Sequence, residues 1–142
     1  MTRDALKGFI AGVVSTLVFH QTLIWLLAQV LPFPFKPWNL AINRYGVPTV
    51  AALAFWAGVW GIVLCLLLVA RPSLRPMPTG IVFGALLPSL WSWTVIATMR
   101  GTPLFAGGAP KSIAVGLLVN GVWGAGTVWL FGRMRHRQAA LT

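Results

Sequence analysis

The sequence predicts an all-α polytopic membrane protein with four transmembrane helices. Of its 142 residues, 58% are hydrophobic and only 8% are charged, whereas a water-soluble domain is about one quarter charged. Four stretches contain no Asp, Glu, Lys or Arg, and they cover residues 8–31, 48–70, 79–99 and 113–132. Each is long enough to cross roughly 30 Å of hydrocarbon as a helix, and a lipid-exposed helix satisfies its own backbone. Only short links and tails remain, so we expect residues 1–142 to form a single membrane domain.

The first span, residues 8–31, follows Arg3 and Lys7 and therefore begins like a signal peptide. It is longer than the roughly 7–15 residues of a signal-peptide core, and no A-x-A cleavage pattern directly follows it. We expect it to be retained as a transmembrane helix.

The second and third spans each contain one unusual residue. The second, residues 48–70, contains Cys65, the only cysteine, which excludes an intrachain disulfide and a C-x-x-C motif. The third, residues 79–99, contains Pro88 near its middle. Proline removes a backbone donor and clashes with the preceding turn, so we expect a kink there. The fourth span, residues 113–132, ends at a basic tail.

The formal net charge of +10 marks the ends of these spans. In a soluble chain it would indicate nucleic-acid binding, but in so apolar a chain we expect no nucleic-acid partner. Four is an even number, so both termini lie on one side of the membrane. Seven cations share that side: Arg3, Lys7, Arg71, Arg75, Arg133, Arg135 and Arg137. Four lie on the other: Lys36, Arg44, Arg100 and Lys111. The positive-inside rule predicts that both termini lie in the cytoplasm.

The scarcity of acidic residues limits the chemistry available to one chain. Asp4 is the only carboxylate among the side chains. A glycosidase-type carboxylate pair, an Asp/Glu metal cage and a Ser-His-Asp triad are therefore excluded within one chain. We expect no enzyme and no metal site.

The chain reads as two copies of one helical hairpin, residues 1–70 and 71–142. The openings match at an offset of 72 residues, Gly8 and Gly12 with Gly80 and Gly84. The second halves match at an offset of 63, Gly58-Val59-Trp60-Gly61 with Gly121-Val122-Trp123-Gly124. Two-span units run in the same direction, so this would be a parallel repeat rather than the inverted repeat of many transporters.

Small residues at a spacing of four predict where the helices pack, because helices in lipid associate through close backbone approach. The predicted packing residues are Gly8, Gly12, Gly58, Gly61, Gly80, Gly84, Gly116, Gly121 and Gly124. We interpret them as contacts inside the bundle, with a homo-oligomer interface as the alternative.

Four polar residues inside the spans are the candidate site: His20, Gln21, Ser92 and Asn120. Polar groups in a membrane are costly and mark function by default. In the structural interpretation, neutral His20 hydrogen-bonds Thr16 or a residue on another helix, Asn120 or a serine. In the second, His20 lines a polar pocket or a proton path, since it is the one residue in the spans that ordinarily titrates near neutral pH.

The third interpretation is that His20 ligates a haem or a chlorophyll-type pigment. Haem with two histidine ligands needs a second buried His, and the other one, His136, lies in the basic tail. A second copy of the chain would have to supply it. Otherwise we expect no cofactor.

Eight tryptophans and two apolar links are the remaining features. Trp25, Trp38 and Trp129 lie near span ends, where indole anchors to the interface. The deeper tryptophans either pack the bundle or line an aromatic cavity: Trp56, Trp60, Trp91, Trp93 and Trp123. The links around residues 32–48 and 101–108 are rich in proline, glycine and aromatic residues. We expect them to be ordered turns at the membrane surface, suited to docking a partner.

Three segments together resemble a group of small, uncharacterised four-span membrane proteins of proteobacteria. They are Phe19-His20-Gln21, Gly46-Val47-Pro48 and Leu53-Ala54-Phe55-Trp56-Ala57-Gly58-Val59-Trp60-Gly61. The resemblance covers most of the chain and implies the same four-span fold and a bacterial inner-membrane location, but it implies no activity, substrate or cofactor. Small multidrug transporters are similar in size, yet they depend on a membrane-embedded Glu that this chain lacks.

The leading functional hypothesis is an accessory or assembly subunit, surrounded by the lipid bilayer, that packs against another membrane protein or against itself. The small-residue stripes, the tryptophan content and the lack of catalytic groups favour it. A small channel or transporter with a polar path at His20, Gln21 and Asn120 is the alternative. Haem or pigment binding at His20 is the third hypothesis.

Overall fold

The computed structural model describes residues 1–31 and 36–139, with side chains through residue 136. In this part of the chain the fold is all-α, and four helical spans are each long and apolar enough to cross a membrane. They cover Thr2–Val30, Thr49–Ala70, Pro76–Arg100 and Pro110–His136. The predicted fold class is therefore confirmed.

Two of the spans contain a π-helical turn between two α-helices. The first span consists of α1 (Thr2–Ser15), the turn Thr16–His20 and α2 (Gln21–Val30). The third consists of α4 (Pro76–Trp91), the turn Ser92–Ile96 and α5 (Ala97–Arg100). The second span is α3 (Thr49–Ala70), and the fourth is α6 (Pro110–Ala139), which follows a short 3-10 turn at Leu104–Gly108. Pro88 lies inside α4, which continues past it to Trp91.

Proline marks the point where three of the spans begin. α3 follows Pro48, α4 begins at Pro76 and α6 begins at Pro110. A proline in the first helical turn costs no hydrogen bond, because an N–H there would have no partner in the helix. The first, third and fourth helices begin several residues before the apolar ranges in the sequence, since flanking polar residues can continue a helix beyond the hydrocarbon.

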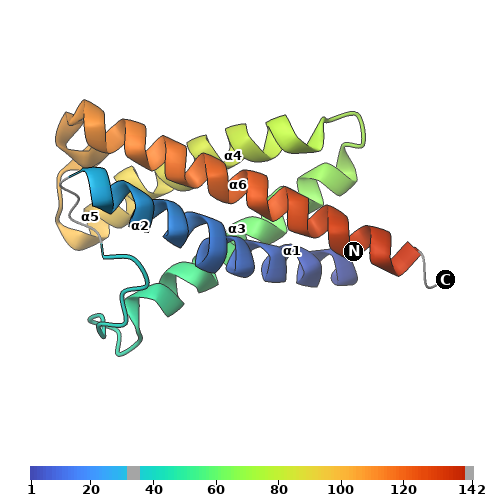
Figure 1. Ribbon diagram of the computed structural model, residues 1–142, viewed down its shortest axis with the longest axis horizontal. Helices are drawn as coiled ribbons and strands as arrows, with labels where there is room; N and C mark the ends of the chain where they lie inside the picture. The colour runs from blue at the N-terminus through green and yellow to red at the C-terminus, as the bar shows by residue number, and fades with distance from the viewer. Residues whose placement is uncertain (32–35, 140–142) are drawn as a thin grey trace.

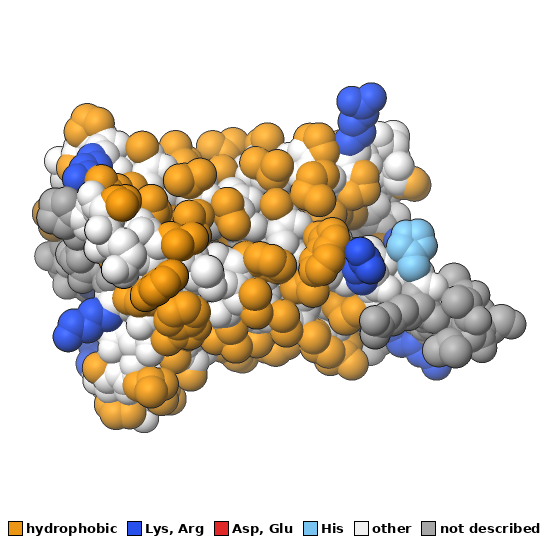
Figure 2. Space-filling view, viewed as in Figure 1, with side chains coloured by type: hydrophobic (Ala, Val, Ile, Leu, Met, Phe, Trp, Pro, Cys, Tyr) orange, Lys and Arg blue, Asp and Glu red, His pale blue; other side chains and the backbone are white. Residues whose placement is uncertain are grey.

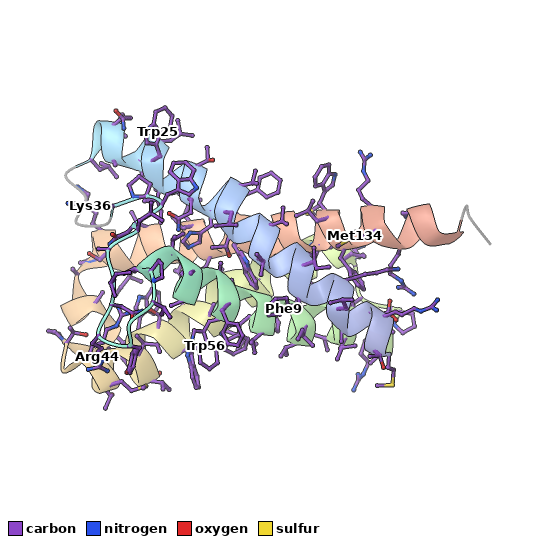
Figure 3. All side chains as sticks on the ribbon, turned by 90° about the horizontal axis from the view of Figure 1, so that it is seen from below. Phe9, Trp25, Lys36, Arg44, Trp56 and Met134 are labelled. Carbon is purple, nitrogen blue, oxygen red and sulfur yellow. The ribbon has the colours of Figure 1, made fainter. Side chains whose placement is uncertain are left out.

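The four spans form two antiparallel pairs. α1 packs along α3, α4 packs along α6, and α1 packs against α6 to join the pairs. The start of α1 and the end of α6 lie at one end of the bundle, here called the terminal end, and the links that precede α3 and α6 lie at the other, the link end (Figure 1). Towards the link end, α2 and the start of α3 diverge (Figures 1 and 3).

Glycine contacts hold the first pair together. A Cβ atom added to Gly8 would lie 2.8 Å from the carbonyl oxygen of Gly61 and 3.0 Å from Cβ of Cys65. A Cβ added to Gly61 would lie 3.0 Å from Cα of Gly12. Such distances leave no room for a side chain, so α1 and α3 touch backbone to backbone.

The second pair repeats this arrangement. A Cβ atom added to Gly80 would lie 2.8 Å from the carbonyl oxygen of Gly124, and it would also meet the side chain of Val128. A Cβ added to Gly124 would lie 3.1 Å from Cα of Gly84 and would collide with the carbonyl oxygen of Gly80. The backbones of α4 and α6 are therefore also in direct contact.

The contacts in the two pairs correspond residue by residue at the offsets found in the sequence. At an offset of 72, Gly80 and Gly84 correspond to Gly8 and Gly12. At an offset of 63, Gly124 and Val128 correspond to Gly61 and Cys65. Tandem duplication of a hairpin stays a prediction, and this correspondence supports it.

Trp123 joins the two pairs at the centre of the bundle. Its side chain is 2% exposed and packs with Leu64 and Phe83. Its indole Nε1 donates a hydrogen bond to the carbonyl oxygen of Gly12 at 3.0 Å, and Ser15 Oγ donates to the carbonyl oxygen of Trp123 at 2.7 Å. The contact between α1 and α6 is thus both apolar and hydrogen-bonded.

Replacement by alanine should affect stability differently at two buried glycines of α6. Gly124→Ala places a methyl group against the backbone of α4 and should lower the free energy of unfolding by about 1–3 kcal/mol, as overpacking does. Gly121→Ala is the matched control, because its Cβ would find the nearest atoms at 3.6 Å, an ordinary contact. Thermal unfolding in dodecyl maltoside micelles measures both. Equal destabilisation by the two changes would contradict the glycine packing described here.

Candidate functional site

A chain of hydrogen bonds crosses the bundle interior between α4, α6 and the first span. Asn120 Nδ2 on α6 donates to Ser89 Oγ on α4 at 2.8 Å, and the side chain of Asn120 also hydrogen-bonds the imidazole of His20. Gln21 Nε2 lies 3.4 Å from Nδ1 of His20. Ser89 Oγ in turn donates to the carbonyl oxygen of Gly116 at 3.5 Å. The structure therefore brings together three of the four candidate residues, His20, Gln21 and Asn120.

The donors and acceptors of this chain define the tautomer of His20. The amide nitrogen of Gln21 can only donate, so Nδ1 of the imidazole is the acceptor and the ring hydrogen belongs on Nε2. Asn120 uses Nδ2 to donate to Ser89. Its Oδ1 is then the acceptor for the Nε2–H of His20. Each member acts as donor on one side and acceptor on the other, which is how buried polar groups avoid a desolvation cost.

The link before α3 inserts into this chain. The backbone N–H of Trp38 donates to Gln21 Oε1 at 2.7 Å, and Trp38 Nε1 donates to the carbonyl oxygen of Leu17 at 3.0 Å. Trp38 adopts a φ of 46°, which is unusual for a residue other than glycine. Its partner Gln21 lies nine residues before Val30, the last residue of α2. The Trp38 side chain is 41% exposed, so the link folds back along the outside of the first span, and the expected anchoring of Trp38 at the membrane interface stays a prediction.

The π-helical turn in the first span makes this insertion possible. In an α-helix the N–H of Gln21 would donate to the carbonyl of Leu17, four residues earlier. Here it donates to the carbonyl of Thr16, five residues earlier. The carbonyl of Leu17 accepts a hydrogen bond from the indole of Trp38. π-bulges are frequent at functional sites, which adds weight to this region.

Ser92 lies outside the hydrogen-bond chain. Ser92 is exposed at the start of the π-helical turn that follows α4. Ser89 is fully buried and is the serine of the third span that joins the hydrogen-bond chain. His20 and Gln21 are also buried, at 8% and 3% exposure. Among the described side chains, every buried nitrogen and oxygen has a hydrogen-bond partner. The interior polar groups are therefore fully used within the chain.

Haem or pigment binding at His20 stays a prediction. The imidazole has a polar neighbour on each side, Gln21 and Asn120, so an iron ligand at either ring nitrogen would replace one of these hydrogen bonds. In the described part of the chain, His, Cys, Asp and Glu residues form no group of three that could hold a metal. A chain of neutral hydrogen-bond donors and acceptors can position helices, or it can pass a proton between neighbouring groups.

The first link also contacts the C-terminal end of the third span. Arg44 of the first link donates to the carbonyl oxygen of Met99 at 2.9 Å and to the hydroxyl of Tyr45 at 2.7 Å. A cation at the C-terminal end of a helix is favourable, because the carbonyl dipoles point there. Residues 32–35, part of the predicted docking link, lie outside the described residues.

Sequence reasoning missed Ser89, Trp38 and the pairing of Trp123 with Gly12. Ser89 had one signal, since it adjoins Pro88 and a serine partner for the histidine was expected. Trp38 and Leu17 are 21 residues apart, and no local pattern relates a link tryptophan to a mid-span carbonyl. No protein-family model, curated protein or solved structure matches this chain.

Two serines of the third span provide a matched test of the hydrogen-bond chain. Ser89→Ala removes the acceptor of Asn120 and should lower the free energy of unfolding by about 1 kcal/mol, the scale of interhelical hydrogen bonds in membranes. Ser92→Ala makes the same chemical change at an exposed site and should leave stability unchanged. Unfolding of both variants in micelles is the measurement. Unchanged stability of Ser89→Ala, or equal losses in the two variants, would show that the chain does not stabilise the bundle.

Proposed function

We propose that this chain is a non-enzymatic accessory or assembly subunit, which acts by packing against another membrane protein or against a second copy of itself. The observation that carries this proposal is a cluster of exposed and half-buried indoles in the spans, whose N–H groups meet no hydrogen-bond acceptor among the described residues. It is supported by the interior polar groups, which are all satisfied inside the chain. The only side-chain carboxylate, Asp4, pairs with Met1 and Arg135, which leaves no acid for catalysis.

The indoles in question belong to Trp56 and Trp60 on α3 and to Trp91 on α4. Trp60 and Trp91 stack edge to face at 6.2 Å between ring centroids, and Trp56 is 51% exposed. In contrast to Trp38 and Trp123, their N–H groups form no hydrogen bond within the described residues. The face that these three tryptophans form is called the indole face below.

The indole face lies at a depth where lipid offers its N–H groups no hydrogen-bond acceptor. Trp56 lies about 10 Å along α3 from its start, and Trp91 lies about 14 Å from the end of its span, at 1.5 Å per residue. Both positions fall within roughly 30 Å of hydrocarbon. Burying an N–H there without an acceptor costs about 1–3 kcal/mol. A protein neighbour with a carbonyl or hydroxyl acceptor removes that cost, whereas acyl chains cannot.

We also propose a bacterial inner-membrane location with both termini in the cytoplasm. The start of α1 and the end of α6 lie at the same end of the bundle (Figure 1). The tails and the 71–75 link at that end hold seven of the eleven Lys and Arg residues. The positive-inside rule supports this orientation.

Conversion of two indoles to phenyl rings tests the partner proposal. Trp56→Phe with Trp91→Phe keeps the aromatic bulk and removes two N–H donors, so association should weaken by about tenfold at roughly 0.6 kcal/mol or more per lost hydrogen bond. Native mass spectrometry after purification in a mild detergent reports partner and stoichiometry together.

Trp25→Phe is the matched control, because Figure 3 places Trp25 and Trp56 on opposite sides of the molecule. It should leave association intact. A wild-type chain that purifies alone and monomeric would refute the accessory role, and equal loss in the control would refute the indole face as its site.

A channel or transporter remains the second candidate, since His20, Gln21 and Asn120 share one hydrogen-bond chain. If this function is correct, reconstituted liposomes should show proton or solute flux that His20→Ala and Asn120→Ala both reduce. Absent flux, or flux indifferent to both changes, rules this candidate out.

A further inference from the structure

The surface of α6 has a hollow of about 240 Å³ near the terminal end, lined by Trp129, Leu130, Arg133 and Met134. Pockets that enclose a drug-sized ligand measure roughly 300–1,000 Å³. The hollow is therefore of a size to take one part of a larger molecule. Its lining combines one cation with three largely apolar side chains.

Two donors of the hollow have no hydrogen-bond acceptor among the described residues. The guanidinium of Arg133 lies over the ring of Trp129, 5.1 Å from its centroid. Of the ion pairs made by the described residues, those of Asp4 involve Met1 and Arg135 and not Arg133. The indole N–H of Trp129 forms no hydrogen bond with any described residue. An anionic group at this position would find a charge and a neutral donor side by side.

The surroundings of the hollow favour an anion that carries acyl chains. Figure 2 shows Lys and Arg gathered at the two ends of the visible face, with an apolar band between them. Trp129 stacks edge to face on Phe19 at 6.1 Å, so an aromatic surface continues from the hollow towards the middle of the bundle. A ligand seated here has its head at Arg133 and its tail along that surface.

We propose that this hollow is a binding site for the headgroup of an anionic phospholipid from the leaflet at the terminal end. The phosphate accepts hydrogen bonds from the guanidinium of Arg133 and from the indole N–H of Trp129. The acyl chains lie along α6 beside Leu130 and Phe19. The net positive charge of this end, with Asp4 as its only described acidic side chain, selects an anionic lipid over a zwitterionic one.

The test measures lipid adducts by native mass spectrometry on the full chain. The protein is held in dodecyl maltoside micelles with equal amounts of dioleoylphosphatidylglycerol and dioleoylphosphatidylcholine. We expect phosphatidylglycerol adducts to exceed phosphatidylcholine adducts. Arg133→Gln should reduce phosphatidylglycerol occupancy by about fivefold, the factor expected from one cation near an anionic headgroup.

Arg75→Gln is the matched control, because it removes the same charge at the same end but does not line the hollow. Arg75→Gln should change phosphatidylglycerol occupancy by less than about twofold. A larger effect of Arg133→Gln than of Arg75→Gln distinguishes a specific site from general attraction of anionic lipid to this end. Equal adducts of the two lipids, or equal losses in both variants, would overturn the proposal. If Arg133→Gln does not purify folded, Trp129→Phe decides, because it keeps the ring and removes the N–H. Lower phosphatidylglycerol occupancy in that variant supports the site, and unchanged occupancy overturns it.

Discussion

Direct backbone contact between facing glycines is the interaction on which the other features of this bundle depend. Lipid supplies little hydrophobic drive for helices to associate, so each hairpin closes where side chains are missing, at Gly8 with Gly61 and at Gly80 with Gly124. Tight closure near the middle and the terminal end is accompanied by divergence of α2 from α3 at the link end (Figures 1 and 3). The returning link with Trp38 packs against the first span on that side. The polar chain lies at the same level, where three spans and a link can all reach it.

Much of this architecture was predictable because lipid imposes simple rules on a sequence. The uncharged ranges became the four helical spans, and the predicted glycines lie at close helix contacts. Gly121 is the exception, because a Cβ atom there would find its nearest neighbour at 3.6 Å. The polar site was only partly predictable. Residues at a strict spacing of four turn about 40° around an α-helix at each step. Three steps carry Ser92 about 120° away from Gly80, and the same steps carry His20 as far from Gly8.

The same rotation has different results because the two helices have different neighbours. α1 lies between α3 and α6, so a residue turned away from α3 still meets another helix, and His20 reaches Asn120. α4 packs mainly along α6, so Ser92 is turned out of the bundle while Ser89 stays buried. The number of neighbours of a helix is a property of the assembled bundle. Hydropathy and spacing in one chain do not encode it locally, and the π-helical turn further shifts the register on which spacing arguments rely.

The bond between His20 and Asn120 also has a consequence in time. His20 enters the membrane with the first span, and its acceptor is 100 residues further along, in the last span. At about 5–20 residues per second, a ribosome needs of the order of 5–20 s to synthesise that interval. During this time the first hairpin can already form its glycine contacts and accept Trp38, but the imidazole has no Asn120 to receive its hydrogen. Arrival of the fourth helix completes the hydrogen-bond chain, so the last span acts as the step that commits the nascent bundle to its final form.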